Sequence, residues 1–429
     1  MMRSALAALI LTTTLSVEAL AASEQLPSGS QYLGEVRRGP DGKLLSVPKA
    51  VAEPATEGVP APAASVSARV IRVAPGTALA TIPQAAQAAQ DGDIIEIQAG
   101  TYRGQPVVWT QKKLTIRGVG GRPVMLAEGT HAEGKAAWVI RNGDIEIENI
   151  EFRGNRVPDG NGAGIRFERG RLRLRSCAFF DNEMGLLTTN HPEAVLEISD
   201  SEFGAAPRHG TVLHHLLYVG GIARFALTGS RLSGGYRGHL VKSRARENYV
   251  SYNLLVDGPE GQASYELEFP NGGIAYVVGN LIGQSAGTDN MTLIAYGAEG
   301  PRWQDNALYL AHNTLVNDHP NARFLHVWTD KIGASTEVWV LNNLSAGTGT
   351  LEPFGSGRFE GNVSVPRSSL IPADGIPARL PVSSPLRGTV RPPGEVRGKS
   401  LLPSAEFSFP VGSKAISLPA RLAPGAFQQ

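Results

Sequence analysis

The chain repeats one six-residue pattern, as in Val250-Ser-Tyr-Asn-Leu-Leu255, Val277-Val-Gly-Asn-Leu-Ile282 and Leu310-Ala-His-Asn-Thr-Leu315. Apolar residues flank small residues or asparagine in the copies. The fourth positions of the copies lie 27, 24, 29, 23, 27, 33, 30 and 19 residues apart, and they are Ile150, Cys177, Ser201, Ser230, Asn253, Asn280, Asn313, Asn343 and Asn362. A repeat of roughly 20 to 30 residues, with short segments in which apolar and polar residues alternate, indicates a solenoid of stacked coils. The coils must stack because one coil cannot bury its inward side chains alone.

The asparagines of this repeat predict a ladder inside the solenoid. Stacked side-chain amides in a tight turn can pass hydrogen bonds from one coil to the next. Cys177 occupies the same position in an earlier copy. We therefore expect it to be a small buried filler of the row and not a reactive thiol.

The two ends of the repeat region carry a family resemblance. The opening Ile82-Pro-Gln-Ala-Ala86 and Asp91-Gly-Asp-Ile-Ile-Glu-Ile-Gln-Ala-Gly-Thr-Tyr102, with the closing Gly412–Ile416 and Ala423–Phe427, resemble the right-handed parallel β-helix superfamily of pectate-lyase-like proteins. The resemblance covers residues 70–429. It implies an all-β, right-handed parallel β-helix of about ten coils, and Thr81–Gln90 is expected to form a short N-terminal capping helix.

Composition and the N-terminal sequence limit the possible class of protein and its cellular location. The 429 residues include 40 Lys+Arg, 39 Asp+Glu and a single cysteine, which excludes an internal disulfide and gives no support for nucleic-acid binding. Residues 1–22 read as a secretory signal peptide, with Arg3 before an apolar run that is too short to span a membrane. Residues 23–69 read as a disordered leader or linker, and 70–429 as the β-helix domain. We expect a periplasmic or extracellular protein with no membrane span.

Titratable side chains concentrate on the second strand of the middle coils. Stacking of consecutive coils should place Tyr218, Lys242 and Glu268 in one row, about 5 Å apart per step. Alternation along a strand should put Arg244 beside Lys242 and Glu266 beside Glu268. The same alternation turns His239 inward or toward the preceding bend, which leaves structural roles open for His239 and His215.

The stretch from Lys242 to Asn253 resembles the alginate lyase and chondroitinase B branch of polysaccharide lyases. In that branch such a lysine removes the proton next to a uronate carboxyl group, so the resemblance implies β-elimination on an acidic polysaccharide, with Lys242 as the base. The following strand, Tyr265–Asn271, is acidic here where that branch has a basic one. The chain also lacks the Asp-Pro-His-Asp signature of periplasmic alginate epimerases.

The other roles are assigned by side-chain chemistry. Tyr218 or His215 is the candidate proton donor to the leaving oxygen. The candidates for holding the substrate are Arg237, His239, Arg244, Arg246, Asn271 and Trp303. Ca²⁺ is the candidate cofactor, and its candidate ligands are Glu266, Glu268 and Asp289.

Two other functions remain open at this stage. Glu266 and Glu268 are a candidate carboxylate pair for a glycoside hydrolase. A non-catalytic polysaccharide-binding or structural solenoid would instead show Lys242 and Glu268 as an ordinary ion pair in solvent, worth about 0–1 kcal/mol. An enzyme requires these groups to converge with altered ionisation. Trp303 is either a sugar-stacking platform or a core residue.

Overall fold

The computed structural model describes residues 34–38, 44–48, 68–208, 213–354 and 356–428. The expected signal peptide, residues 1–22, lies outside the described residues. Within the expected leader the structure describes residues 68 and 69 and one antiparallel pair, β1 (Gly34–Arg38) with β2 (Leu44–Pro48). No helix in the described part of the chain has the length and apolar character that a membrane crossing demands.

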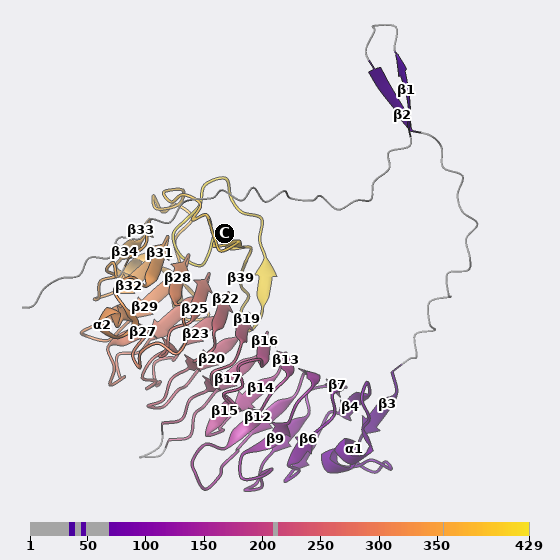
Figure 1. Cartoon of the computed structure of the whole chain (residues 1–429). Coiled ribbons are helices and arrows are strands. Elements are labelled where there is room, and N and C mark those ends of the chain that lie inside the picture. The colour runs from indigo at the N-terminus through magenta and orange to yellow at the C-terminus, as the bar shows by residue number, and fades with distance from the viewer. Residues whose placement is uncertain (1–33, 39–43, 49–67, 209–212, 355, 429) are drawn as a thin grey trace, which may run out of the picture. The chain divides into compact units, whose positions relative to one another are not determined.

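Residues from Val70 onward form a parallel β-solenoid of about ten coils, which confirms the expected fold class (Figure 1). A complete coil contributes one strand to each of three parallel sheets, and the coils at the two ends are incomplete. The first sheet has twelve strands, in the order β3 (Val70–Val73), β4 (Ile94–Gln98), β7 (Lys113–Val119), β10 (Asp144–Glu148), β13 (Arg171–Arg175), β16 (Val195–Ser199), β19 (Arg224–Thr228), β22 (Glu247–Ser251), β25 (Ile274–Val278), β28 (Ala307–Ala311), β31 (Glu337–Leu341) and β33 (Phe359–Glu360).

The second and third sheets follow the same stacking order. The second has eleven strands: β5 (Thr101–Arg103), β8 (Val124–Leu126), β11 (Glu151–Arg153), β14 (Ala178–Phe180), β17 (Glu202–Gly204), β20 (Arg231–Ser233), β23 (Leu254–Val256), β26 (Leu281–Gln284), β29 (Thr314–Asn317), β32 (Leu344–Gly347) and β34 (Val363–Val365). The third has nine: β6 (Val107–Trp109), β9 (Ala136–Ile140), β12 (Ala163–Phe167), β15 (Met184–Thr188), β18 (Leu217–Val219), β21 (Val241–Ser243), β24 (Leu267–Phe269), β27 (Thr292–Tyr296) and β30 (Arg323–Val327).

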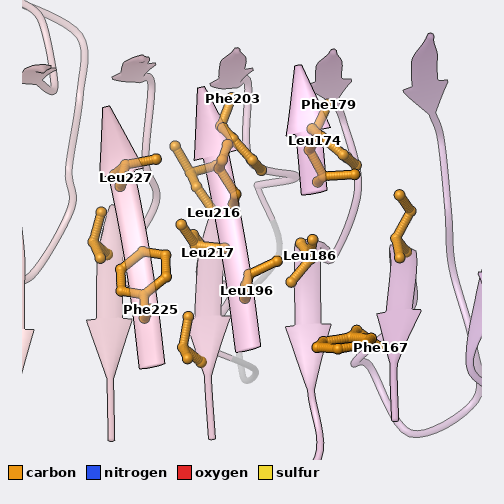
Figure 2. Close-up of a cluster of buried hydrophobic side chains, with 14 of the residues drawn as sticks. Phe167, Leu174, Phe179, Leu186, Leu196, Phe203, Leu216, Leu217, Phe225 and Leu227 are labelled. Carbon is orange, nitrogen blue, oxygen red and sulfur yellow. The ribbon is translucent and has the colours of Figure 1, made fainter. Parts of the chain in front are cut away.

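The core lies inside the stacked coils. Inward side chains from the three sheets form one continuous apolar cluster along the solenoid. Figure 2 shows part of it, with Phe179 and Phe203 from neighbouring coils close together. Their ring centroids lie 4.5 Å apart in a stacked arrangement. Burial of these rows between coils supplies the apolar contacts that a single coil lacks.

The asparagine ladder is confirmed. The Nδ2 of Asn253 donates to Oδ1 of Asn280 over 2.9 Å, and Asn280 donates in the same way to Asn313 over 2.9 Å. The row continues through Asn343 to Asn362. Cys177 is fully buried in this row, as expected, with its backbone N–H donating to Oγ of Ser201 over 3.1 Å.

A short helix, α1 (Ile82–Ala88), precedes the first complete coil and packs against β3 and β6. Thr81 begins it with a reciprocal cap. The Thr81 hydroxyl accepts from the Gln84 backbone N–H over 3.3 Å, and the Gln84 side chain accepts from the Thr81 backbone N–H over 3.1 Å. The capping helix expected between Thr81 and Gln90 is therefore present.

The coils end at Val365, and the remaining chain folds back over outer faces of the solenoid. The tail contains the 3₁₀ turn η1 (Arg367–Ser369) and three antiparallel pairs: β35 (Ile371–Ala373) with β36 (Ile376–Arg379), β37 (Glu395–Val396) with β38 (Lys399–Ser400), and β39 (Ala405–Phe407) with β40 (Ser413–Ala415). A second short helix, α2 (Thr329–Ile332), follows β30.

Candidate functional site

The third sheet aligns the expected row of side chains. Tyr218 of β18 pairs in register with Lys242 of β21, and Lys242 pairs in register with Glu268 of β24. Neighbouring strands lie about 4.8 Å apart, so the three side chains follow one another at that step. The repeat therefore predicted their alignment correctly.

Lys242 and Glu268 form an ion pair that is removed from solvent. The Nζ of Lys242 lies 3.0 Å from Oε2 of Glu268, with side-chain exposures of only 11% and 4%. The Arg175–Glu148 pair on the first sheet has a similar length, 2.9 Å, but exposures of 57% and 28%. Lys242 and Glu268 thus differ from the exposed surface pair that a purely structural solenoid was expected to show.

Arg244 connects this row to two polar neighbours. Its Nε donates to the Tyr218 hydroxyl over 3.0 Å, with the guanidinium 5.7 Å from the Tyr218 ring centre. Its Nη1 donates to Oδ1 of Asn271. The half-buried Trp303 donates from Nε1 to the backbone carbonyl of Arg244 over 3.0 Å. Trp303 therefore anchors the site, while part of its ring stays exposed.

Glu299 is a member of the site that the sequence interpretation missed. It lies in the loop between β27 and β28 and contacts both cations of the cluster. Its carboxylate lies 3.2 Å from Lys242 Nζ. It also accepts hydrogen bonds from Nη1 and Nη2 of Arg244, over 2.5 and 3.0 Å. The hydrogen bond from Arg244, with the nearby charge of Lys242, lowers the pKa of Glu299 to about 2. Glu299 is therefore a carboxylate at any ordinary working pH.

Two histidines form a second layer behind Glu268. The Nε2 of His239 lies 3.0 Å from Oε2 of Glu268, and its Nδ1 accepts from the Tyr265 backbone N–H over 3.4 Å. The Nδ1 of His215 accepts from the His239 backbone N–H over 2.9 Å. Burial lowers the pKa of both imidazoles. Because each Nδ1 accepts a hydrogen bond, each neutral ring carries its hydrogen on Nε2.

His239 faces Glu268 although strand alternation suggested an inward or bend-facing side chain. Strand β21 begins only at Val241, so the two-residue period does not extend back to position 239. The rings of His215, His239 and Tyr265 instead follow one another, with centroids 4.6 and 4.9 Å apart. Tyr265 was not among the expected site residues.

Glu266 has a different environment from Glu268. Strand β24 begins at Leu267, and Glu266 occupies the position that Leu240 and Leu293 hold in the adjacent coils. Its side chain is fully buried, and neither carboxyl oxygen has a hydrogen-bond partner in the described structure. Burial, reinforced by Asp257, raises the pKa of Glu266 well above its usual range. Glu266 is therefore placed as a neutral core residue.

The expected calcium ligands do not come together as a cation site. Glu268 is engaged by Lys242 and His239, Glu266 lies in the core, and Asp289 is exposed in the loop after β26. Across the described ranges, no group of three or more His, Cys, Asp or Glu side chains is placed to hold a metal ion. This donor set does not fit Ca²⁺, which requires several oxygen ligands that converge on one point.

The remaining candidates lie at the margins of the cluster. Arg237 is exposed in the bend before β21, with a left-handed backbone (φ 59°), and Arg246 is exposed just beyond Arg244. A cavity of about 540 Å³ lies elsewhere, beside β23, β26 and the tail pair β35–β36. Its lining is mostly apolar, with Val256, Val316 and Ile376 among its residues, which suits a charged polymer poorly.

Comparison with known proteins adds no family assignment. A scan of the chain against protein-family models gives no match, and a search of curated proteins gives none either. The geometry of the cluster is therefore the feature of this protein that points to a function.

Proposed function

We propose that this protein is a carbohydrate-active enzyme that cleaves an acidic polysaccharide by β-elimination. The observation that supports the proposal is the hydrogen bond from Arg244 to the hydroxyl of Tyr218, with Lys242 in register beside Tyr218 on the next strand. β-Elimination removes the proton next to a uronate carboxyl group, so it requires a proton acceptor beside groups that neutralise that carboxylate. Lys242, Arg244 and Tyr218 supply both kinds of group within one half-buried cluster.

The contacts of the cluster support one division of roles. Tyr218 accepts a hydrogen bond from the Arg244 guanidinium, and such an oxygen is stabilised when it carries negative charge. We therefore assign Tyr218 as the acceptor of the proton next to the uronate carboxyl group. Lys242, with two carboxylates at 3.0 and 3.2 Å, is placed as a cation, so we assign it proton donation to the leaving oxygen. This differs from the expectation drawn from the sequence, in which Lys242 was the base and Tyr218 or His215 the candidate proton donor.

The electron balance of the step is complete with these residues. Tyr218 enters the step as its phenolate, with its own proton already passed to solvent, and the phenolate oxygen takes the proton from the carbon next to the carboxyl group. The electron pair of that C–H bond becomes the new carbon–carbon double bond, and the glycosidic carbon–oxygen bond breaks. The leaving oxygen takes a proton from Lys242. After the step Tyr218 gives this proton to solvent and Lys242 takes one back. Glu268 and His239 hold Lys242 in position from behind and do not touch the sugar in this scheme.

The hydrolase alternative finds less support. A glycoside hydrolase needs two carboxyl groups that both reach the scissile bond. Glu266 lies wholly inside the core, and Glu268 is paired with two basic side chains. We therefore do not propose hydrolysis by this pair.

The test is an elimination assay on a panel of uronate polysaccharides, including alginate and bacterial exopolysaccharides, read by the ultraviolet absorbance of the unsaturated product. Tyr218→Phe should lower the rate at least about 100-fold, because it removes the acid–base group. Lys242→Ala should lower it comparably. Tyr249→Phe and Lys113→Ala, which alter the first sheet, are the matched controls and should retain the wild-type rate. Full activity of Tyr218→Phe would contradict this mechanism, and new reducing ends without absorbance would point to hydrolysis.

A further inference from the structure

We infer that Arg244 and Lys242 form a carboxylate-binding site that the protein's own Glu299 occupies until a uronate carboxylate replaces it. This inference rests on the proposed function and names the group that the substrate must displace. The contact geometry supports it. The Arg244 guanidinium binds the Glu299 carboxylate through two nitrogens, at 2.5 and 3.0 Å, and Lys242 contacts the same carboxylate at 3.2 Å. A substrate carboxylate would use the same bidentate geometry.

The charge balance of the cluster identifies Glu299 as the exchangeable partner. Two cations, Lys242 and Arg244, face two carboxylates, Glu268 and Glu299. The Glu268 side chain is only 4% exposed, whereas that of Glu299 is 43% exposed. Departure of Glu299 therefore leaves one uncompensated positive charge in a half-buried site. A uronate carboxylate restores neutrality, and a neutral sugar does not.

The exchange needs only a rotation of the Glu299 side chain. The backbone around it is held: the Glu299 N–H donates to the Pro270 carbonyl over 2.8 Å, and Asn271 Nδ2 donates to the Gly300 carbonyl over 3.1 Å. The Glu299 side chain itself is 43% exposed, so solvent adjoins it. Because the pKa of Glu299 lies near 2, mild acid does not release it, and a competing anion must do so.

The test compares binding of acidic and neutral sugars to variants at position 299. The probes are hexamers of galacturonate, mannuronate and guluronate and their carboxyl-reduced neutral forms, titrated calorimetrically. All proteins carry Tyr218→Phe so that no hexamer is consumed. Glu299→Ala should bind an acidic hexamer about tenfold more tightly than the parent, because the internal competitor is gone. Glu299→Gln, which removes the charge and keeps the shape, should shift binding in the same direction.

The controls separate this inference from the function beneath it. Glu193→Gln removes one exposed negative charge elsewhere and should leave binding unchanged, which excludes a general charge effect. Carboxyl-reduced hexamers should bind the parent and Glu299→Ala with the same affinity. Acidic hexamers that bind the parent and Glu299→Ala equally would overturn the inference and leave the proposed function standing. Absence of binding to every variant would contradict the proposed function and the inference with it.

Discussion

At the scale of single residues, Glu266 is the least expected feature of the core. Its row through the third sheet is otherwise apolar, with Leu240 and Leu293 in the adjacent coils. Glu266 is wholly buried, and its carboxyl oxygens have no hydrogen-bond partner among the described residues. A carboxyl group in such surroundings is accommodated only in its protonated form, since a buried unpaired charge costs far more.

This burial makes folding stability depend on pH. Burial raises the folded-state pKa of Glu266 well above its value in the unfolded chain, about 4.3. At pH values below about 4.3 the group is protonated in both states, so it adds no pH dependence to the free energy of unfolding. As pH rises further, only the unfolded state releases the proton, so the free energy of unfolding falls by about 1.4 kcal/mol per pH unit until the folded-state pKa is reached.

Glu266→Gln should remove this dependence because glutamine does not ionise. Urea unfolding should be measured from pH 4 to pH 8. The free energy of unfolding of Glu266→Gln should increase relative to that of the wild type as the pH rises. Other groups titrate equally in both proteins, so the difference between the two curves isolates residue 266. Glu193→Gln is the control and should track the wild type. A constant difference between wild type and Glu266→Gln at all pH values would show that Glu266 is already ionised in the folded protein.

At the scale of elements, the asparagine row joins consecutive coils at the turn between the first and second sheets. Asn280 accepts at Oδ1 from the Asn253 backbone N–H and side chain, at 3.0 and 2.9 Å. It donates from Nδ2 to Asn313 at 2.9 Å and to the Val250 carbonyl at 2.8 Å. Every polar atom of this buried side chain is thus used, and loss of the side chain leaves several buried partners unsatisfied.

Asn280→Ala should lower the free energy of unfolding by about 2–4 kcal/mol, because more than one buried group loses its partner. Chemical denaturation followed by circular dichroism measures the effect. Cys177→Ser is a control in the same row, because serine already fills this position at Ser201 and Ser230. It should change stability by no more than about 1 kcal/mol. Equal losses for both variants would show that the row acts through packing and not through its amide ladder.

At the scale of the whole molecule, the described part of the C-terminal tail packs over two faces of the solenoid other than the one that carries the candidate site. Tail residues such as Phe407 and Phe427 cover the second sheet around Leu281, and Val396 and Leu401 pack near Tyr309 on the first sheet. The clusters that contain tail residues include no strand of the third sheet. Among the described residues, the apolar contacts of the tail therefore lie on the first and second sheets and not on the face that carries Tyr218, Lys242 and Glu268.

The solenoid and the register of its site could be predicted because both follow from the repeat period. Asn280 and its counterparts align consecutive coils, and that alignment places Lys242 between Tyr218 and Glu268. Glu299 could not be predicted, because it lies in a loop whose path no strand period describes. The orientation of His239 could not be predicted either, because alternation holds only within a strand and β21 has three residues.

The most direct test of the account is a crystal structure of Tyr218→Phe with the tightest-binding acidic hexamer. We predict a sugar carboxylate within hydrogen-bond distance of Arg244 and Lys242, with the Glu299 side chain rotated toward solvent. The aromatic ring at position 218 should lie beside the carbon that bears the carboxyl group. A hexamer bound elsewhere, as in the cavity beside Val256 and Ile376, with Glu299 still on Arg244, would contradict the account.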